Sequence, residues 1–193
     1  MPQTRLLDSL RRSCDLTAET FEKQAGELTR LSGAIVEAFH RDARLFIAGS
    51  GNLAQIAALV EAYFVDRLTS FERPPLPAVA LGQNLPLGTA LDQHGRSAER
   101  LARPFSMLAR SGDLLLMFAD GGHDPALEAL GQAAADLGCP TTLVRPERLD
   151  WTGPPVEFCF QLPTDHDGEQ VELSLLFGRL LCELVERGLF QAV

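Results

Sequence analysis

Apolar residues recur every three to four positions along residues 4–40, the spacing that places them on one face of a helix. They are Leu6, Leu7, Leu10, Leu16, Phe21, Leu28, Leu31, Ile35, Val36 and Phe39. The pair Ser32-Gly33 predicts a break into two helices. The rest of the domain cannot easily cover the apolar face of so long a helical segment. We therefore expect residues 4–31 to be buried between subunits of a homo-oligomer.

From residue 43 onward the pattern changes to short apolar runs that alternate with helical segments. The expected strands cover residues 44–48, 78–81, 113–118, 141–144 and 156–162. The expected helices cover 53–68, 97–110, 125–137 and 169–187, with Pro104 either in a first turn or at a kink. Such alternation is typical of a parallel sheet covered on both faces. The sequence therefore predicts an α/β fold, a doubly wound five-stranded parallel sheet flanked by helices, with an N-terminal helical extension.

The length of 193 residues fits one α/β domain, residues 43–193, preceded by oligomerisation helices over residues 1–42. The formal net charge of −9 argues against direct nucleic-acid binding, which needs clustered Lys and Arg, but permits a basic protein partner. The first ten residues lack the apolar stretch of a signal peptide, and no apolar run reaches the ~18 residues of a membrane span. We expect a cytoplasmic protein that does not bind a membrane.

The four cysteines lie far apart along the chain, at Cys14, Cys139, Cys159 and Cys182. No Cys-x-x-Cys pair occurs, so the sequence indicates neither a zinc ribbon nor a redox motif. We expect each thiol to be reduced and to lie in an apolar environment, as is usual for free cysteines in a cytosol.

Two expected strand-to-helix turns are rich in glycine and short polar residues. The first consists of Gly49, Ser50, Gly51 and Asn52, and the second of Asp120, Gly121, Gly122, His123 and Asp124. In an open parallel sheet, ligands bind where such loops leave the strands, and the next helix N-terminus offers N–H groups to an anion. The first turn is not a dinucleotide fingerprint, because Ala54 stands where the third glycine would fall. From these residues, a ligand pocket and an ordinary tight turn both remain open.

Four stretches of the chain resemble the sugar isomerase (SIS) family, and within it the phosphoheptose isomerases and the related replication factor that binds the bacterial initiator DnaA. They are residues 45–67 with the Gly-Ser-Gly-Asn turn, 71–81 (FERPPLPAVAL), 111–116 (SGDLLL) and 181–186 (LCELVE). The resemblance covers essentially the whole chain, and these four stretches carry it in the family's order. The resemblance implies a five-stranded parallel sheet between helices, usually assembled as a tetramer, which agrees with the elements expected above.

The first turn keeps part of the family's pattern. Gly49 and Gly51 match its glycines, whereas Ser50 replaces Asn, and Asn52 and Leu53 replace Gly-Ser. The resemblance implies that this turn contacts the ligand.

The second turn departs further, because the family has a Ser/Thr-rich phosphate loop there. The matching residues 119–124 keep only Gly122; three hydroxyls are gone, and Asp120 and Asp124 have appeared. A carboxylate repels a phosphate dianion unless a metal or a proton intervenes. Together with His123, the two aspartates would place three metal ligands within five residues of one turn, which is an unusual geometry, so we expect no metal there.

Aldose–ketose isomerisation needs a base that moves a proton on carbon and an acid that serves the oxygens. The resemblance assigns these roles to a Glu after the first turn and a His on the last helix, and those positions hold Tyr63 and Ser174. The family's zinc-binding His positions hold Leu59 and Arg179. Leu does not ligate zinc, and a permanently charged guanidinium is a poor ligand. We therefore expect no metal and no other cofactor.

Other residues could supply the chemistry if the helices are aligned one residue apart. Glu61 then becomes a candidate acid, and Gln170 with Glu172 a candidate pair on the last helix. His94 aligns with a family loop that reaches the active site, and Arg67 matches an arginine that is a candidate phosphate partner. The plain alternatives are an exposed or interface carboxylate for Glu61, a solvated loop for His94 and a helix-end cation for Arg67.

The leading interpretation is a SIS-fold homo-oligomer, a tetramer or at least a dimer, that binds a phosphorylated sugar or a related anionic carbohydrate and has weak or absent isomerase activity. One alternative is an active sugar-phosphate isomerase that uses the displaced residues Glu61, His94 and Glu172. The other is a non-catalytic scaffold that binds another protein, as the DnaA-binding relative does.

Overall fold

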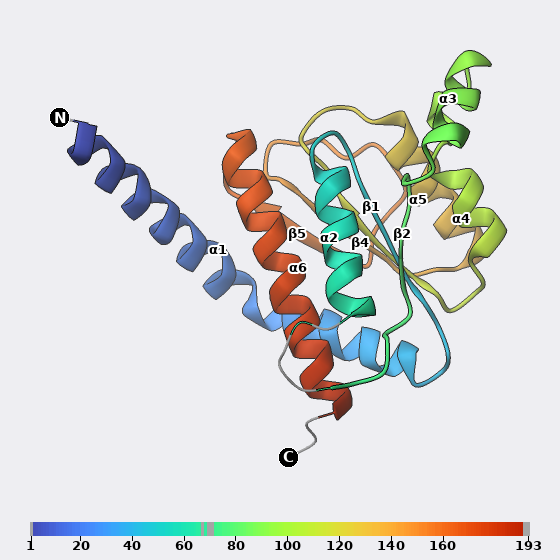
Figure 1. The fold of residues 1–193 in the computed structure, drawn as a ribbon, viewed down its shortest axis with the longest axis horizontal. Coiled ribbons are helices and arrows are strands. Elements are labelled where there is room, and N and C mark those ends of the chain that lie inside the picture. The colour runs from blue at the N-terminus through green and yellow to red at the C-terminus, as the bar shows by residue number, and fades with distance from the viewer. Residues whose placement is uncertain (1, 67, 69–71, 191–193) are drawn as a thin grey trace.

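The computed structural model describes residues 2–66, 68 and 72–190. A parallel five-stranded sheet in the order β2-β1-β3-β4-β5 forms its centre, which confirms the predicted architecture (Figure 1). The strands are β1 (Leu45–Gly49), β2 (Ala78–Ala80), β3 (Leu114–Phe118), β4 (Thr141–Pro146) and β5 (Phe158–Leu162). The helices are α1 (Pro2–Phe39), α2 (Leu53–Val65), α3 (Leu85–Gln93), η1 (Ser97–Glu99), α4 (Ala102–Leu108), α5 (Pro125–Leu137) and α6 (Asp167–Phe190). Across these residues, no helix has the length and apolar character needed to cross a membrane.

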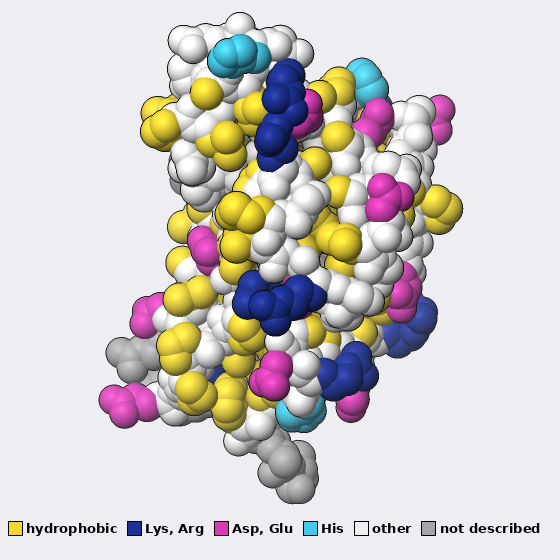
Figure 2. Space-filling model, turned by 90° about the vertical axis from the view of Figure 1, so that its right-hand side faces the viewer, with side chains coloured by type: hydrophobic (Ala, Val, Ile, Leu, Met, Phe, Trp, Pro, Cys, Tyr) yellow, Lys and Arg dark blue, Asp and Glu magenta, His cyan; other side chains and the backbone are white. Residues whose placement is uncertain are grey.

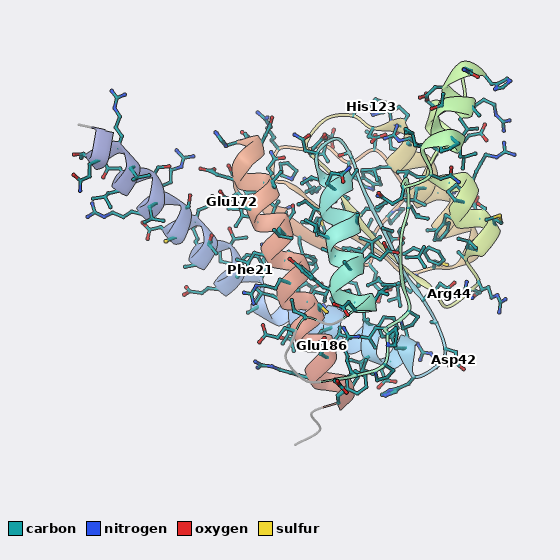
Figure 3. All side chains as sticks on the ribbon, viewed as in Figure 1. Phe21, Asp42, Arg44, His123, Glu172 and Glu186 are labelled. Carbon is teal, nitrogen blue, oxygen red and sulfur yellow. The ribbon has the colours of Figure 1, made fainter. Side chains whose placement is uncertain are left out.

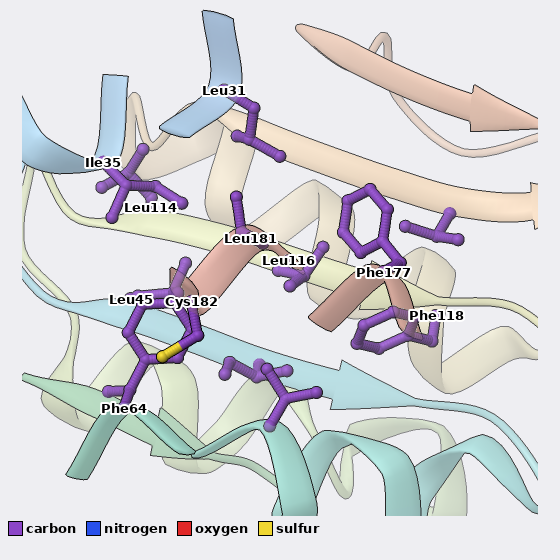
Figure 4. Close-up of a cluster of buried hydrophobic side chains, with 14 of the residues drawn as sticks. Leu31, Ile35, Leu45, Phe64, Leu114, Leu116, Phe118, Phe177, Leu181 and Cys182 are labelled. Atoms are coloured by element: carbon purple, nitrogen blue, oxygen red, sulfur yellow. The ribbon is translucent and has the colours of Figure 1, made fainter. Parts of the chain in front are cut away.

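Helices cover both faces of the sheet because its central strands are apolar on both sides. β1 and β3 are buried along their whole length, and alternate side chains point to opposite faces. Leu45 and Ile47 belong to the core under α1, α2 and α6, part of which is drawn in Figure 4. Phe46 and Ala48 belong to the core under α4 and α5. Because all strands are parallel, their carboxyl ends lie at one edge of the sheet, where a ligand site is expected.

The helix α1 is continuous, so the expected break at Ser32-Gly33 is wrong. Leu31 and Ile35, on either side of the pair, are buried in the core and hold this turn in place. The Ser32 hydroxyl donates to the Thr29 carbonyl oxygen at 2.9 Å. Gly33 faces open space, so its missing side chain leaves no gap. Tertiary packing here overrides the low helix propensity of glycine.

The two ends of α1 have different surroundings. From Leu28 onward the helix joins the core beside α6, whereas its first part projects from the domain (Figure 1). Leu6 and Leu10 on the projecting part are 68% and 57% exposed. Between these parts, the Gln24 side-chain amide pairs with the backbone of Gln161, with 2.9 Å between donor and acceptor in both directions. The helix therefore covers the outer edge of β5 and presents an apolar stripe beyond it.

The connection between β2 and β3 differs in detail from the prediction. The single helix expected over residues 97–110 is divided into η1 and α4, and Pro104 lies in the first turn of α4. The helix α3 is not among the predicted elements. A signal for it exists in the sequence, because the Asn84 side chain accepts from the Leu87 backbone N–H at 3.0 Å and Pro86 follows in the first turn.

The expectation that every cysteine lies in an apolar environment is wrong for two of them. Cys139 and Cys182 are buried, and Cys14 and Cys159 are exposed. Cys159 faces outward because it alternates with the buried residues of β5, and Cys14 is on the projecting part of α1. Burial, together with the charge of Glu186, raises the pKa of the Cys182 thiol to about 12.

Candidate functional site

The first glycine turn is shaped by crowding at the end of β1. A Cβ on Gly49 would lie 2.3 Å from the backbone oxygen of Leu53, so only glycine fits where the strand turns into α2. Gly51 has a φ of +47°, in the region that glycine adopts without strain. Ser50 between them is buried, and its backbone N–H donates to the Phe118 carbonyl oxygen at 2.9 Å. These contacts fix the turn against the end of β3.

Asp120 joins the two turns. The Asp120 backbone N–H donates to Ser50 Oγ at 2.8 Å, and Asp120 Oδ1 accepts from the Gly122 N–H at 3.1 Å. Asp120 Oδ2 lies over Gly51, where an added Cβ would come 2.3 Å from it. The space between the turns therefore holds a negative charge, which opposes a phosphate dianion.

Asp124 occupies the N-terminus of α5. Asp124 Oδ1 accepts from the Ala126 N–H at 2.8 Å, so the carboxylate is the helix N-cap. Asp124 Oδ2 pairs with Arg100, between η1 and α4, at 2.8 Å. The chain's own carboxylate therefore takes the place that an anionic ligand would take at this helix end. The neighbouring His123 is exposed, and its Nδ1 lies 3.1 Å from Glu128 Oε1.

A small cavity of about 70 Å³ opens at the carboxyl edge of the sheet. It is lined by Asn52, Leu53, Asp120, Asp167, Gln170 and Val171, which come from the two turns and the start of α6. Gln170 is buried, and its Nε2 donates to the Thr164 carbonyl oxygen at 3.4 Å. Small-molecule pockets usually measure ~300–1,000 Å³. The cavity is therefore smaller than the pockets that usually hold a sugar-sized ligand.

The structure brings the two predicted turns together, since Asn52 and Asp120 line the same cavity. It adds Asp167 and Gln170, which the turn motifs alone do not indicate. The order of the strands and helices could have indicated these two residues. Because β5 is parallel to its neighbour and leads into α6, the first turns of α6 must lie at the same edge.

A larger cavity, of about 730 Å³, lies along the outer edge of β2. Its walls are mostly apolar and include Leu81, Leu85 and Pro104, while Asp92 and Arg100 contribute charges. Figure 2 shows hydrophobic side chains spread over this side of the molecule, with Lys and Arg side chains among them. No pattern in the sequence predicts this cavity, because α3, which forms one wall, is itself not predicted.

Comparison with known proteins connects this architecture to a family. No family model matches the chain. The phosphoheptose isomerase of Solidesulfovibrio magneticus is 30% identical over 176 residues, which cover 91% of this chain and 85% of that protein. The chain belongs to the phosphoheptose isomerase family. The phosphoheptose isomerase of Roseiflexus sp. is 28% identical over 186 residues, covering 96% and 94%.

The three-dimensional comparison agrees. A phosphoheptose isomerase structure from Francisella tularensis matches with a TM-score of 0.87 at 19% identity, over 97% of this chain and 99% of that one. This match confirms the SIS fold.

At the positions where the resemblance to phosphoheptose isomerases places zinc and the catalytic pair, this chain presents unsuited side chains. Leu59 and Tyr63 are on α2, and Ser174 and Arg179 are on α6. Ser174 is fully buried, and in the described part of the chain its Oγ has no hydrogen-bond partner. Arg179 pairs with Glu183 at 3.3 Å. Over the same residues, no three His, Cys, Asp or Glu side chains gather where they could hold a metal ion.

The displaced candidates lie on three helices. Glu61 is half-buried on α2 and Glu172 is exposed on α6, two helices that pack against each other (Figure 3). His94 is exposed at the end of α3, with its Nδ1 2.6 Å from the Ala90 carbonyl oxygen. Figure 1 shows α3 at the opposite side of α2 from α6, so one chain does not bring His94 to the other two residues. Arg67 lies outside the described residues.

A buried ion pair behind α2 and α6 has no signal in the local sequence. Arg73 Nε lies 2.6 Å from Glu186 Oε1, and both side chains are 0% exposed. The Arg73 guanidinium also donates to the carbonyl oxygens of Tyr63 and Phe64, at 2.7 and 2.8 Å. Glu186 Oε1 accepts from the Leu68 N–H at 3.1 Å. The pair therefore fixes the end of α2 to α6 and to the chain that leads into β2.

Proposed function

We propose that the chain binds a phosphorylated sugar or a related anionic carbohydrate at the carboxyl edge of the sheet and has weak or no isomerase activity. The observation that supports this is the cavity between the turns, whose polar side chains come from three separate elements. Relatives named phosphoheptose isomerase point to a sugar phosphate as the class of ligand. The residues proposed to contact it are Gly49, Ser50, Gly51, Asn52, Asp120, Gly121, Gly122, His123 and Asp124, with Arg67 as a further candidate.

The proposal of weak activity rests on the residues at the reactive positions. Tyr63 and Ser174 offer no carboxylate and no imidazole for proton transfer on carbon. Leu59 and Arg179 do not fit zinc, so we assign no step to a metal and propose no cofactor. Asp120 and Asp124 weaken the attraction for phosphate.

Sedoheptulose 7-phosphate at 100 times its dissociation constant is expected to stabilise the fold by about 2.7 kcal/mol, because it binds only the folded chain. Thermal unfolding followed over a concentration series measures this shift. Unphosphorylated sedoheptulose serves as the control, since it lacks the group that the helix N-termini would hold. An unfolding midpoint that stays constant across the series would contradict binding at this edge.

We also propose that residues 1–42 assemble the α/β domain of residues 43–193 into a homo-oligomer, a tetramer. The exposed stripe of Leu6, Leu7 and Leu10 supports this, because a projecting helix with an apolar face is stabilised when a partner covers that face.

Leu6→Gln together with Leu10→Gln is expected to lower the mass of the particle in light scattering, because the two amides must be desolvated at the interface. Ser9→Gln, at an exposed position of the same helix that is already polar, is the matched control and should leave the mass unchanged. Cys14 should react faster with a thiol reagent in the double variant, while Cys159 reacts equally in both. A wild-type protein that is monomeric at every concentration would exclude this assembly.

A protein-interaction role is the second candidate, and one surface favours it. Leu85 and Met107 are 78% and 76% exposed on the side of the molecule that carries the β2 cavity. Exposed apolar side chains of this size at a cleft are typical of surfaces that bind other proteins. The net charge of −9 suits a basic partner.

A further inference from the structure

A separate cavity of about 270 Å³ lies on the outer side of the second turn. It is enclosed by the start of α5 and by residues 149–152, from the connection between β4 and β5. It shares no lining residue with the cavity at the carboxyl edge. Its volume is close to the lower end of the ~300–1,000 Å³ range of small-molecule pockets. His123 and Asp124, which are also proposed contacts of the sugar phosphate, line this cavity.

Trp151 forms a fixed aromatic wall of the cavity. Its Nε1 donates to the Pro154 carbonyl oxygen at 2.8 Å, so the polar atom of the ring is already satisfied. Gly153 makes room for the ring, because a Cβ there would lie 2.3 Å from Trp151 Cζ2, and Gly131 lies beside it, where a Cβ would be in ordinary contact at 3.4 Å from the same atom. The indole is therefore held in one position and offers the cavity an apolar surface with a low entropy cost on binding.

A short polar network faces the same space. Glu128 Oε1 accepts from the Thr152 hydroxyl and lies 3.1 Å from His123 Nδ1. Glu128 Oε2 has no hydrogen-bond partner among residues 2–66, 68 and 72–190, and it can accept from a ligand. Asp150 adds an exposed carboxylate at the cavity wall. The cavity thus combines acceptors for hydroxyl groups with an aromatic surface.

Charge decides which class of ligand fits. Asp124 is compensated by Arg100, but Glu128 and Asp150 leave the cavity acidic. An anionic ligand would be repelled, whereas hydroxyl groups donate to carboxylates, and the C–H face of a sugar ring is apolar enough to pack on indole. We propose that this cavity binds the uncharged ring of a monosaccharide. This ligand differs from the sugar phosphate in its charge, and the cavity that holds it is not the one at the carboxyl edge, although Gly122, His123 and Asp124 are proposed for both ligands.

The chain contains a single tryptophan, so its fluorescence reports on this cavity alone. D-glucose, D-mannose and D-galactose are titrated into the full chain, with saturation-transfer NMR on the same samples. We expect a saturable change in Trp151 emission and saturation transfer to ring protons for at least one sugar. With concentrations on the order of 10 mM, a site with a Kd near 1 mM is almost filled. Absence of both signals for all three sugars would overturn the proposal.

Variants of the lining residues show whether sugar binds in this cavity or affects the protein in a general way. Glu128→Gln and Thr152→Val are each expected to weaken sugar binding at least tenfold, and Trp151→Phe, followed by NMR, to weaken it as well. Glu157→Gln, an exposed change on the same connection, should leave it unaltered. Thermal unfolding shows which variants fold. If either Glu128→Gln or Thr152→Val fails to fold, the other still tests the polar contacts of the cavity. Unchanged binding in the folded variants would overturn the proposal. Displacement of the hexose by sedoheptulose 7-phosphate would also overturn it, because the hexose would then occupy the sugar-phosphate site at the carboxyl edge.

Discussion

Replacing Glu186 by Gln is expected to lower the free energy of unfolding by about 3–5 kcal/mol, the usual cost of removing one partner from a buried ion pair. Arg73 would keep its charge in a fully buried position, because the guanidinium cannot lose its proton. The Arg73 contacts to the carbonyl oxygens of Tyr63 and Phe64 would remain, but neutral acceptors do not replace a carboxylate. Since small domains are stable by only ~5–15 kcal/mol, such a loss is large.

Urea unfolding of the wild type and variants measures the effect. Arg187→Gln is the matched control on the same helix: it breaks an exposed pair with Glu183, and such pairs contribute only ~0.3–0.5 kcal/mol. Replacing both partners by apolar residues, Arg73→Met with Glu186→Leu, should recover most of the loss, because no buried charge is left. A loss below about 1 kcal/mol for Glu186→Gln would show that the pair is not the tie between α2 and α6 that its geometry indicates.

The second large effect is a gain of function at the second turn. Asp120→Thr together with Asp124→Ser is expected to raise the affinity for a sugar phosphate more than tenfold. At ~4 Å and an effective dielectric constant of ~20, two unit charges repel by about 4 kcal/mol before screening, and half of that exceeds a factor of ten. The substitutions remove two carboxylates and supply two hydroxyl donors.

The structure gives further reasons for this gain. Thr at position 120 is uncharged and takes less of the space over Gly51 that the Asp120 carboxylate fills. Ser at position 124 remains a good N-cap for α5, so the helix should not be destabilised. Arg100 would lose its carboxylate partner and could pair with the phosphate instead.

Calorimetric titration of sedoheptulose 7-phosphate into the parent and the double variant measures the change. Asp66→Asn with Asp136→Asn is the control, because it removes two negative charges from exposed positions away from the turns. A similar gain in that control would mean that net charge, rather than the turn, limits binding. Equal affinities in all three proteins would mean that the two aspartates do not weaken the site.

The sheet could be predicted because parallel strands buried on both faces leave continuous apolar runs, as at residues 45–49 and 114–118. The break at Ser32-Gly33 was a wrong prediction because a local propensity of about 1 kcal/mol is smaller than the burial of Leu31 and Ile35 on either side. The short helix α3 lacks a strong apolar period, and its cap at Asn84 is a weaker signal.

The candidate site was predictable only in part. The glycine turns follow strands, so their place at the carboxyl edge can be inferred from the alternation of elements. Arg73 and Glu186 are separated by 113 residues, and only the packing of α2 on α6 brings them together. The same holds for Trp151, whose place beside Gly131 depends on how a long connection folds over α5.

The most direct test of sugar-phosphate binding with weak or no turnover is one ³¹P NMR experiment. Increasing amounts of the wild-type protein are added to sedoheptulose 7-phosphate, with and without added zinc. We predict that the phosphate signal broadens with protein concentration while little or no product signal appears in either sample. A product signal that grows in proportion to the protein would show an active isomerase, and a phosphate signal that stays sharp would show that the carboxyl edge binds no sugar phosphate.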